Sequence, residues 1–374
     1  MNSREVINQH MEWIGKYENK SKDEITIFRF MCCNDVTYIP SNAFRCLINL
    51  QEIHLSGGDS TITEIHPDAF RGLTNLQKLD LSHNDIRSLH PTQFHGLVNL
   101  KQLNLSFNRI DRLYPDQFND LSHLQELNLA YNEIYILHPN QFHGVSNLQV
   151  LNLFLNQIAK IYPEQFNGLT KLRELNIAHN NISQIHPKQF HELANLQKLF
   201  FYCSQATSFS IDQFHKLLNL QELWFECDQM KELHSEQFHG LPNLEKLYIT
   251  TKQINDFYPN QFSGLIQLQE LCLDSKHIEL YPEQFGDLSN LKRLTLECDN
   301  VLTLPELLFE GVVSLTGLHL NNVKRIHFTI KEYLIKNETK VYNHIDTYSD
   351  YDIDDFEIDY DIEGHEFVAK GAMN

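Results

Sequence analysis

The chain has 374 residues, of which 42% are hydrophobic and 21% are charged, a composition typical of folded proteins. Its formal net charge is −19, and residues 341–374 alone carry ten acidic side chains and one lysine. The chain therefore offers no basic face of the kind that phosphate backbones require, which argues against a nucleic-acid partner.

The N-terminal residues 1–24 are polar and charged. They hold no apolar run long enough for a signal peptide, and no part of the chain has 18 consecutive apolar residues, so we expect no membrane span. Four apolar residues at roughly helical spacing predict a short helix over residues 4–18, which either caps the fold or contacts a partner; they are Val6, Ile7, Met11 and Ile14. The seven cysteines are odd in number and scattered, which favours an intracellular, cytoplasmic protein with reduced thiols.

From Leu50 onward, one pattern repeats with a period close to 24 residues. Residues 79–81 alternate apolar and polar, which predicts a short strand with one buried face. Asn84 then turns the chain, and Phe94 points back toward the core. One unit buries apolar side chains worth on the order of 15 kcal/mol, whereas ordering its backbone costs on the order of 25–50 kcal/mol. The units must therefore stack, and stability depends on neighbouring units.

A phenylalanine recurs at one position of each unit and predicts an internal spine. The spine residues are Phe44, Phe70, Phe94, Phe118, Phe142, Phe166, Phe190, Phe214, Phe238, Phe262, Phe285 and Phe309. With the leucine pattern, this spine resembles the leucine-rich-repeat family in its 24-residue form. The resemblance implies an α/β repeat solenoid, a curved horseshoe with a parallel β-sheet on its concave face, and it implies protein binding by that face.

The limits of the pattern divide the chain into five expected parts. A closing helix is expected from Thr329 to Asn337, and the acidic C-terminus is expected to be disordered. The parts are an N-terminal arm over residues 1–24, a degenerate capping repeat over 25–49, one uninterrupted solenoid over 50–322, a C-terminal cap over 323–340 and an acidic tail over 341–374.

Asparagine occupies the turn position of five consecutive units and predicts a structural ladder, because a buried amide can pair backbone groups of its own turn and of the neighbouring one. The ladder residues are Asn84, Asn108, Asn132, Asn156 and Asn180. Beyond Leu196 the same position holds Ser204, Asp228, Lys252, Lys276 and Asp299. A lysine has no acceptor and must extend outward, so we expect the second half of the solenoid to be less regular.

Strand residues between the inward leucines face the concave side. At the middle of successive strands, amides give way to Phe200, Trp224 and Tyr248, and Phe154 and Tyr202 lie two positions further along their own strands. Since neighbouring strands are about 4.8 Å apart, the rings are expected to form one patch. The patch is either a protein-binding site centred on Trp224, across the units from Leu148 to Leu268, or a set of cross-strand pairs that only stabilises the sheet.

No catalytic motif occurs, since GxSxG, the P-loop and HExxH are all missing from the sequence. Two columns of histidines follow the repeats, but equivalent positions in stacked repeats lie in a row and do not converge on one point, so we expect no metal and no cofactor. Solvated surface is the expected role of these histidines, with a pH-responsive surface as the alternative. Cys203 and Cys227 occupy the same position in adjacent units, within reach of a disulfide, and reduced thiols are expected there.

These observations predict a non-catalytic scaffold that binds a protein of unknown identity through its concave face. Two alternatives remain open. One is a substrate-recruiting subunit of a ubiquitin ligase, which normally carries an F-box before its repeats. The other is a secreted or surface recognition receptor, which normally has cysteine-rich caps. The acidic tail either keeps the protein soluble or contacts a basic partner, and the oligomeric state is not indicated.

Overall fold

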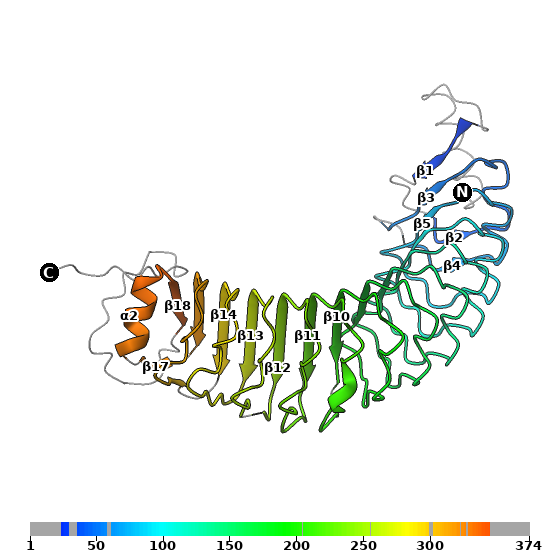
Figure 1. Ribbon diagram of the computed structural model, residues 1–374. Coiled ribbons are helices and arrows are strands. Elements are labelled where there is room, and N and C mark those ends of the chain that lie inside the picture. The colour runs from blue at the N-terminus through cyan, green and yellow to red at the C-terminus, as the bar shows by residue number, and fades with distance from the viewer. Residues whose placement is uncertain are drawn as a thin grey trace. The chain divides into compact units, whose positions relative to one another are not determined.

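The computed structural model describes residues 24–29, 36–57, 61–203, 205–254, 256–298, 302–321, 323–326 and 328–344. They form two compact units, divided between Leu196 and Gln197 and called here unit 1 and unit 2. In each unit the chain winds in stacked coils, and one strand of every coil joins a parallel sheet (Figure 1). The expected solenoid is therefore confirmed. The expected helix over residues 4–18 and the tail beyond residue 344 lie outside the described residues.

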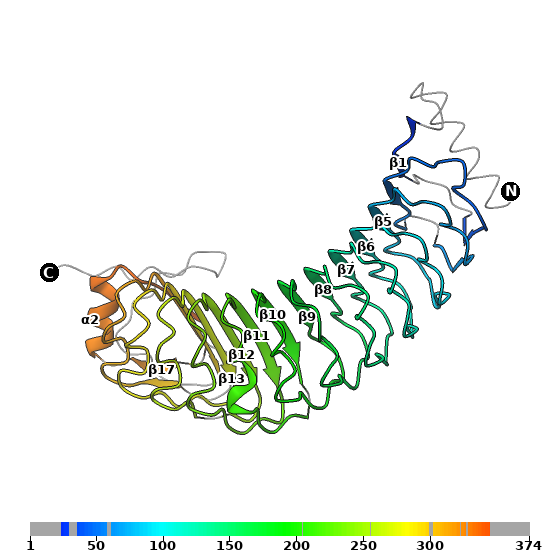
Figure 2. The ribbon, with the colours of Figure 1, turned by 45° about the vertical axis from the view of Figure 1, so that its right-hand side comes forward.

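The sheet of unit 1 is built from short strands. Figure 2 shows successive strands of this unit side by side. Each pair joins equivalent positions of successive coils, so that Leu79 lies beside Leu103 and Leu103 beside Leu127. A second, small sheet pairs β2 (Tyr38–Ile39) with β4 (Glu64–Ile65). The strands of the main sheet, in spatial order, are β1 (Ile27–Arg29), β3 (Glu52–His54), β5 (Lys78–Asp80), β6 (Gln102–Asn104), β7 (Glu126–Asn128), β8 (Val150–Asn152) and β9 (Glu174–Ile177).

Unit 2 has longer strands in the same parallel arrangement. Four of them, β11 to β14, span six residues each. A 3-10 helix, η2 (Ile211–Gln213), lies between β10 and β11 in the chain, and β15 (Leu302–Leu304) pairs with β17 (Val323–Ile326) apart from the main sheet. The main sheet, in spatial order, comprises β10 (Lys198–Tyr202), β11 (Glu222–Cys227), β12 (Lys246–Thr251), β13 (Glu270–Ser275), β14 (Arg293–Cys298), β16 (Gly317–Asn321) and β18 (Lys340–His344).

The core follows the sequence pattern closely. All twelve predicted spine phenylalanines are buried, with at most 3% of any side chain exposed. Neighbouring spine rings stack in parallel; the Phe214 and Phe238 centroids are 6.5 Å apart and those of Phe238 and Phe262 are 6.3 Å apart. At this spacing the rings are in dispersion contact along each unit. Phe28 extends the N-terminal end edge-on to Phe44.

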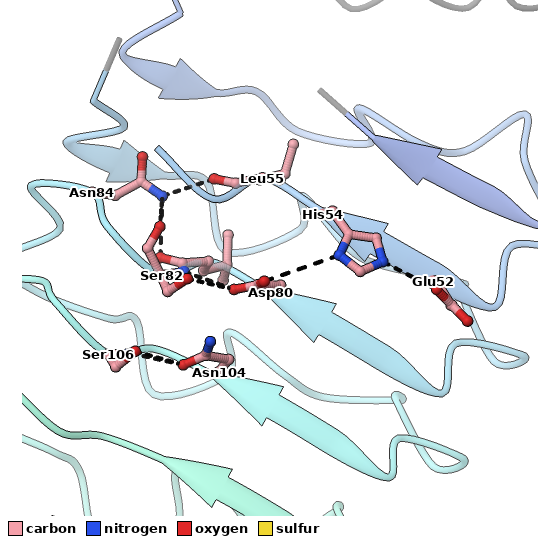
Figure 3. A network of polar contacts seen from close by, with 9 residues as sticks. Glu52, His54, Leu55, Asp80, Ser82, Asn84, Asn104 and Ser106 are labelled. Atoms are coloured by element: carbon pink, nitrogen blue, oxygen red, sulfur yellow. Dashed lines mark hydrogen bonds and ion pairs between the residues drawn. The ribbon is translucent and has the colours of Figure 1, made fainter. Parts of the chain in front are cut away.

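The asparagine ladder forms as predicted. The Asn84 side chain donates to the carbonyl oxygens of Leu55 (2.8 Å) in the preceding coil and of Leu81 (3.1 Å) in its own coil (Figure 3). Its carbonyl oxygen accepts the backbone N–H of Ile62 at 2.8 Å. Asn108, Asn132, Asn156 and Asn180 repeat these contacts one coil further on each time. One buried amide per coil thus pairs backbone groups that would otherwise be left without partners.

A second feature accompanies the ladder and was not predicted. The residue before each ladder asparagine has a positive φ of 51–55°, a left-handed conformation that costs side-chain-bearing residues on the order of 1 kcal/mol. These residues are His83, Phe107, Tyr131, Leu155 and His179. The first three stack, with centroid distances of 4.2 Å between His83 and Phe107 and 4.0 Å between Phe107 and Tyr131. Ring stacking and the adjacent ladder bonds offset the backbone strain.

A glutamine ladder runs through both units beside the phenylalanine spine. The side chain of Gln93, for example, donates to the backbone carbonyl of His66 at 2.9 Å, 27 residues earlier and one coil back. The members are at most 4% exposed. They include Gln93, Gln117, Gln141, Gln165, Gln189, Gln237, Gln261 and Gln284. Several of these carbonyls also accept a backbone N–H from their own coil, as His66 does from Ala69, so the glutamine fills their second acceptor site from the next coil.

The C-terminal end of unit 2 is covered by α2 (Phe328–Lys336), close to the closing helix expected from Thr329 to Asn337. Tyr333 of this helix stacks on Phe309 at 5.3 Å and donates to the Val312 carbonyl at 2.7 Å, so it takes the next place in the spine. The boundary expected at residue 341 is wrong, because β18 continues to His344 and pairs with β16. Residue 342 had been placed in the tail, yet Tyr342 stacks on His319 with centroids 4.3 Å apart.

Replacing one ladder asparagine tests the ladder's contribution to stability. Asn132→Ala removes the donor to Leu105 (2.9 Å) and Leu129 (3.1 Å) and the acceptor for the N–H of Ile110 (3.0 Å), all of them buried. We expect the free energy of unfolding to fall by about 2–4 kcal/mol, measured by urea denaturation followed by circular dichroism. The matched control is Asn99→Ala, whose bond to Thr74 is exposed and whose loss should cost less than about 0.5 kcal/mol. Equal losses for the two variants would contradict a structural ladder.

Candidate functional site

The residue in the middle of each strand decides how long the strand runs. In β5 to β9 of unit 1 this residue is an asparagine or aspartate that accepts the backbone N–H two positions on, as Asn104 does from Ser106 at 3.1 Å. Asp80 also accepts the hydroxyl of Ser82 at 2.7 Å (Figure 3). Such side-chain turns end the strand. In unit 2 the position holds Phe200 in β10 and Trp224, Tyr248, Cys272 and Thr295 in β11 to β14, none of which is an asparagine or aspartate. Strands β11 to β14 therefore continue for six residues.

The longer strands give unit 2 an outward sheet surface of three rows, called here the open face. Figure 1 shows β11, β12, β13 and β14 side by side, and their register aligns the rows across the strands. The first row is Lys198, Glu222, Lys246, Glu270 and Arg293; the middle row is Phe200, Trp224, Tyr248, Cys272, Thr295 and His319; the third row is Tyr202, Glu226, Thr250, Asp274 and Glu297. The strands are thus longer where the middle-row asparagine or aspartate is missing, whereas the loss of the ladder asparagine had led us to expect a less regular second half of the solenoid.

Aromatic rings meet in the middle row. The Trp224 indole stacks on the Tyr248 ring with centroids 3.8 Å apart and an interplanar angle of 25°. Phe200 lies on the other neighbouring strand, tilted by 43° with its centroid 6.0 Å from Trp224. Trp224 remains 41% exposed, whereas Phe200 and Tyr248 are half-buried. The structure therefore brings these three predicted residues together, with Trp224 as the most exposed ring.

The first row holds those rings by hydrogen bonds to carboxylates. The indole N–H of Trp224 donates to Glu222 at 2.8 Å, and the Tyr248 hydroxyl donates to Glu270 at 2.7 Å. Glu270 also pairs with Arg293 and with Lys246 at 3.8 Å. Burial alone would raise the pKa of Glu270, but the hydrogen bonds from Tyr248 and Arg293 outweigh it, and the pKa is lowered. Glu270 is therefore ionised at neutral pH and keeps the Tyr248 ring in place.

A second polar cluster lies at the end of β10 and β11. The Tyr202 hydroxyl donates to Asp228 at 2.9 Å, and Lys252 pairs with the same carboxylate oxygen at 2.8 Å. Burial, followed by the hydrogen bond to Asp228, raises the pKa of Tyr202 to about 12. Lys252 is exposed, as the ladder analysis predicted for a lysine at this position. Tyr202 is thus anchored by its hydroxyl, and its ring contributes to the third row.

Phe154 is the predicted site residue that the structure does not bring to this group. It belongs to unit 1, where its ring meets Tyr131 edge-on at 5.4 Å and His179 edge-on at 5.1 Å. It therefore extends the aromatic column of unit 1. Phe200, Tyr202, Trp224 and Tyr248 all lie on the open face of unit 2.

The carboxylates of the open face were missed by sequence reasoning. Glu222, Glu270 and Asp228 receive the hydroxyl and indole donors of the aromatic residues, yet each looks like an ordinary solvated acid in sequence. The available signal was position: Glu222 and Glu270 each precede an inward leucine in a strand whose middle residue is not an amide. An aromatic hydroxyl or indole one strand away or two residues on then has a carboxylate within reach.

The histidines and cysteines of the described ranges do not converge in groups that could bind a metal ion. In the part of the chain that the structure describes, no group of three or more histidine, cysteine, aspartate or glutamate side chains is placed to hold a metal ion. The Nδ1 atoms of His66 and His234 accept the backbone N–H two residues on, at 3.0 and 3.3 Å. Cys203 and Cys227 are buried free thiols, and burial raises the pKa of both. Across the described ranges, no helix has the length and apolar character needed to cross a bilayer.

Comparison with known proteins identifies the repeat. The leucine-rich-repeat family matches residues 58–110, 99–158, 146–201 and 218–278, which together cover more than half of the chain. No curated protein sequence shows significant similarity.

Solved structures share the fold at low identity. The TLR13–ssRNA13 complex is 24% identical with a TM-score of 0.59, over 83% of this chain and 52% of that one. The Toll–Spatzle complex of Drosophila is 21% identical with a TM-score of 0.67, over 85% and 40%. An internalin of Listeria monocytogenes is 19% identical with a TM-score of 0.61, over 83% and 96%. The chain thus spans about half or less of the two receptor-complex chains, and the likeness concerns the fold alone.

The Tyr202–Asp228 hydrogen bond can be tested by titration. Asp228→Asn removes the carboxylate, so we expect the pKa of Tyr202 to fall from about 12 toward its ordinary value of 10.0, while burial keeps it above that value. The measurement is the tyrosinate absorbance of each protein minus that of the same protein carrying Tyr202→Phe. Because the folded pKa is raised, this tyrosine contributes stability that is complete below pH 10.0 and is lost as the pH rises through about 12. The same midpoint with and without Asp228 would rule out the bond.

Proposed function

We propose, given that the chain belongs to the leucine-rich-repeat family, that it binds a protein partner through the open face of unit 2. The stacked pair of Trp224 and Tyr248, called here the ring pair, forms the centre of the contact. The observation that carries the proposal is the exposure of the indole, 41%, in the middle of an otherwise ordered surface. This proposal places the docking region, expected between Leu148 and Leu268, on the part that belongs to unit 2.

An exposed indole at the centre of a face is unfavourable in an isolated protein. Its burial by a partner would remove apolar area from water at roughly 25 cal/mol per Å². Tryptophan and tyrosine are also enriched among the residues that dominate binding energy, and these residues gather at the centres of interfaces. The carboxylates Glu222 and Glu270 fix the two rings before any partner arrives, so little conformational entropy remains to be lost on binding.

A purely structural role for the ring pair would explain only the part of the indole surface that contacts neighbouring rings. Cross-strand ring pairs stabilise sheets by about 0.2–1 kcal/mol, and the contact of Trp224 with Tyr248 and Phe200 accounts for that gain. The remaining exposed part of Trp224 contributes nothing to the fold. A smaller ring at this position would keep the sheet contact without leaving apolar surface in water.

The polar groups of the open face favour recognition over catalysis. Glu222 and Glu270 are occupied by hydrogen bonds from rings and by ion pairs with basic side chains, which fixes a surface and activates no nucleophile. Their negative charge also disfavours a phosphate backbone as the occupant. We therefore propose a non-catalytic recognition protein that needs no cofactor.

Binding is tested with peptides selected from a displayed random library on the full chain. For a selected peptide, we expect Trp224→Ala to weaken affinity about thirtyfold, as measured by fluorescence anisotropy, because a central aromatic anchor contributes about 2 kcal/mol. The matched control is Leu218→Ala, which removes a side chain that is 54% exposed but lies outside the strands. It should change affinity less than about twofold.

Two results would overturn the proposal. The first is a set of selected peptides whose affinities are the same for the wild-type protein and the Trp224→Ala variant. The second is loss of the far-ultraviolet dichroism or of the unfolding transition in Trp224→Ala, which would make the ring a structural element. If Trp224→Ala unfolds, the Trp224→Phe variant, which keeps a ring on Tyr248, is measured as well. Full binding by Trp224→Phe would mean that the role of Trp224 is structural alone.

A further inference from the structure

The basic side chains on the open face are already paired. Lys198 lies 3.9 Å from Glu222, and Lys246 lies 3.8 Å from Glu270. Arg293 also contacts Glu270, and Lys252 contacts Asp228 at 2.8 Å. Another cation, Lys276, is exposed one residue beyond the end of β13. Their charges are therefore largely compensated within the first row and at the end of β11.

The third row carries acidic side chains and no basic ones. Glu226 on β11, Asp274 on β13 and Glu297 on β14 point outward in register, with Tyr202 and Thr250 as the uncharged members. Glu226 and Glu297 have no cation within ion-pair distance among the described residues. A negatively charged row thus borders the ring pair along one side.

Resting on the function proposed above, we propose that the bound segment of the partner is an extended, arginine-containing stretch, with its guanidinium groups between the middle row and the third row. One arginine stacks on the exposed indole of Trp224 and donates to Glu226, and a second reaches Glu297. The ligand that we expect on this face is therefore a basic peptide segment, either alone or as part of a larger protein.

Arginine fits this position better than lysine. Trp224 and Glu226 are outward residues two positions apart on β11, so their side chains stand about 7 Å apart. A planar guanidinium stacks on a ring face while its N–H groups donate in pairs to a carboxylate, which the point charge of lysine cannot do. The geometry of one aromatic and one acidic neighbour on the same strand thus selects the planar cation.

The spacing of the two carboxylates sets the spacing of the arginines. Glu226 and Glu297 are separated by three strand steps, through Thr250 and Asp274. At about 4.8 Å per step, they lie about 14 Å apart. An extended segment rises about 3.3 Å per residue and alternates its side chains, so residues four positions apart span that distance and face the same way. Arginines at positions i and i+4 are therefore expected, with a small or apolar residue at i+2 between Thr250 and Asp274.

The titration behaviour of the face agrees with a negative potential there. Burial, then the carboxylates of Glu297 and Asp274, raises the pKa of the Cys272 thiol to about 12. Glu226 adds to the groups that raise the pKa of Tyr202. Groups in the middle and third rows thus sense these charges, as a bound guanidinium would with the opposite sign.

The test uses the full chain and a fluorescein-labelled peptide with the core Arg-Gly-Leu-Gly-Arg. Two matched peptides replace both arginines by citrulline, which is neutral and similar in shape, or by glutamate. We expect saturable binding of the arginine peptide at concentrations below about 1 mM and at least tenfold weaker binding of both matched peptides. Binding should weaken as salt is raised, and peptides with arginines at i and i+3 should bind less well.

Variants of the protein assign the effect to the two rows. Combined Glu226→Gln and Glu297→Gln should weaken the arginine peptide at least tenfold and leave the citrulline peptide unchanged. Trp224→Ala should weaken both peptides. The matched control is Glu232→Gln, which neutralises an exposed carboxylate outside the strands and should have no effect.

The outcomes separate this inference from the proposed function. If arginine and citrulline peptides bind equally, or neither binds below about 1 mM, or the double glutamine variant binds normally, the basic-segment inference is wrong. The proposed function then still stands if library-selected peptides depend on Trp224. If selected peptides do not depend on Trp224, the proposed function itself fails. Trp224-dependent binding of a single-stranded oligouridine would overturn the basic-segment inference in favour of an RNA ligand, and self-association that is lost with Trp224→Ala would favour a second copy of the chain.

Discussion

Each coil of this repeat bends the chain sharply, and the buried backbone carbonyls at the bends accept hydrogen bonds from donors beyond the coil as well as from donors within it. Side-chain amides of the next coil are such donors: Asn132 reaches back to Leu105, and Gln141 reaches back to Tyr114. A buried backbone group without a partner costs about 1–3 kcal/mol, so a coil without such an amide must satisfy its bend differently. The glutamine ladder runs through both units, whereas the asparagine ladder ends with Asn180, and most differences between the units follow from that end.

In unit 2 the backbone pairing between neighbouring coils continues without the ladder asparagine. Cys203 donates its N–H to the Glu226 carbonyl, as Phe107 does to Ala130 in unit 1, and further along the Thr251 side-chain hydroxyl donates to the Ser275 hydroxyl. The sheet then extends one outward row beyond its extent in unit 1. In β5 to β9 of unit 1 the middle-row position holds an amide or an acid, which serves as the acceptor that ends the strand. In unit 2 that amide or acid is missing, and the position can hold a large ring. The candidate site is thus a consequence of a change in turn chemistry.

Much of the fold could be predicted because its determinants are local and periodic. Leu79, Phe94 and Asn84 each have one role that repeats every coil, and a repeated role is visible in sequence. The glutamine ladder is equally periodic, but a polar residue beside a spine phenylalanine looks like solvated surface, and only the carbonyl of the preceding coil shows why Gln93 is buried. The left-handed residues, such as Phe107, were missed because the sequence gives no reason to place a ring at positive φ.

The aromatic members of the site could be predicted, but the carboxylates that hold them could not, since their partners lie on neighbouring strands or across a turn. Phe154 was grouped with them from its position in the repeat, and its ring neighbours proved to be those of unit 1.

The charge distribution of the open face has a consequence for specificity. An exposed ring pair attracts any apolar surface, including the same face of another copy, because hydrophobic contact has no direction. The acidic residues Glu226, Asp274 and Glu297 of the third row make the face distinguish between such partners. Two such faces would bring like charges together in a region of reduced dielectric, which is unfavourable, whereas a basic segment gains attraction at the same positions. The acids therefore discriminate by repulsion as well as attraction, and the formal charge of −19 on the whole chain acts in the same direction at longer range. The apolar rings supply affinity without selectivity, and the neighbouring carboxylates select a partner with positive charge.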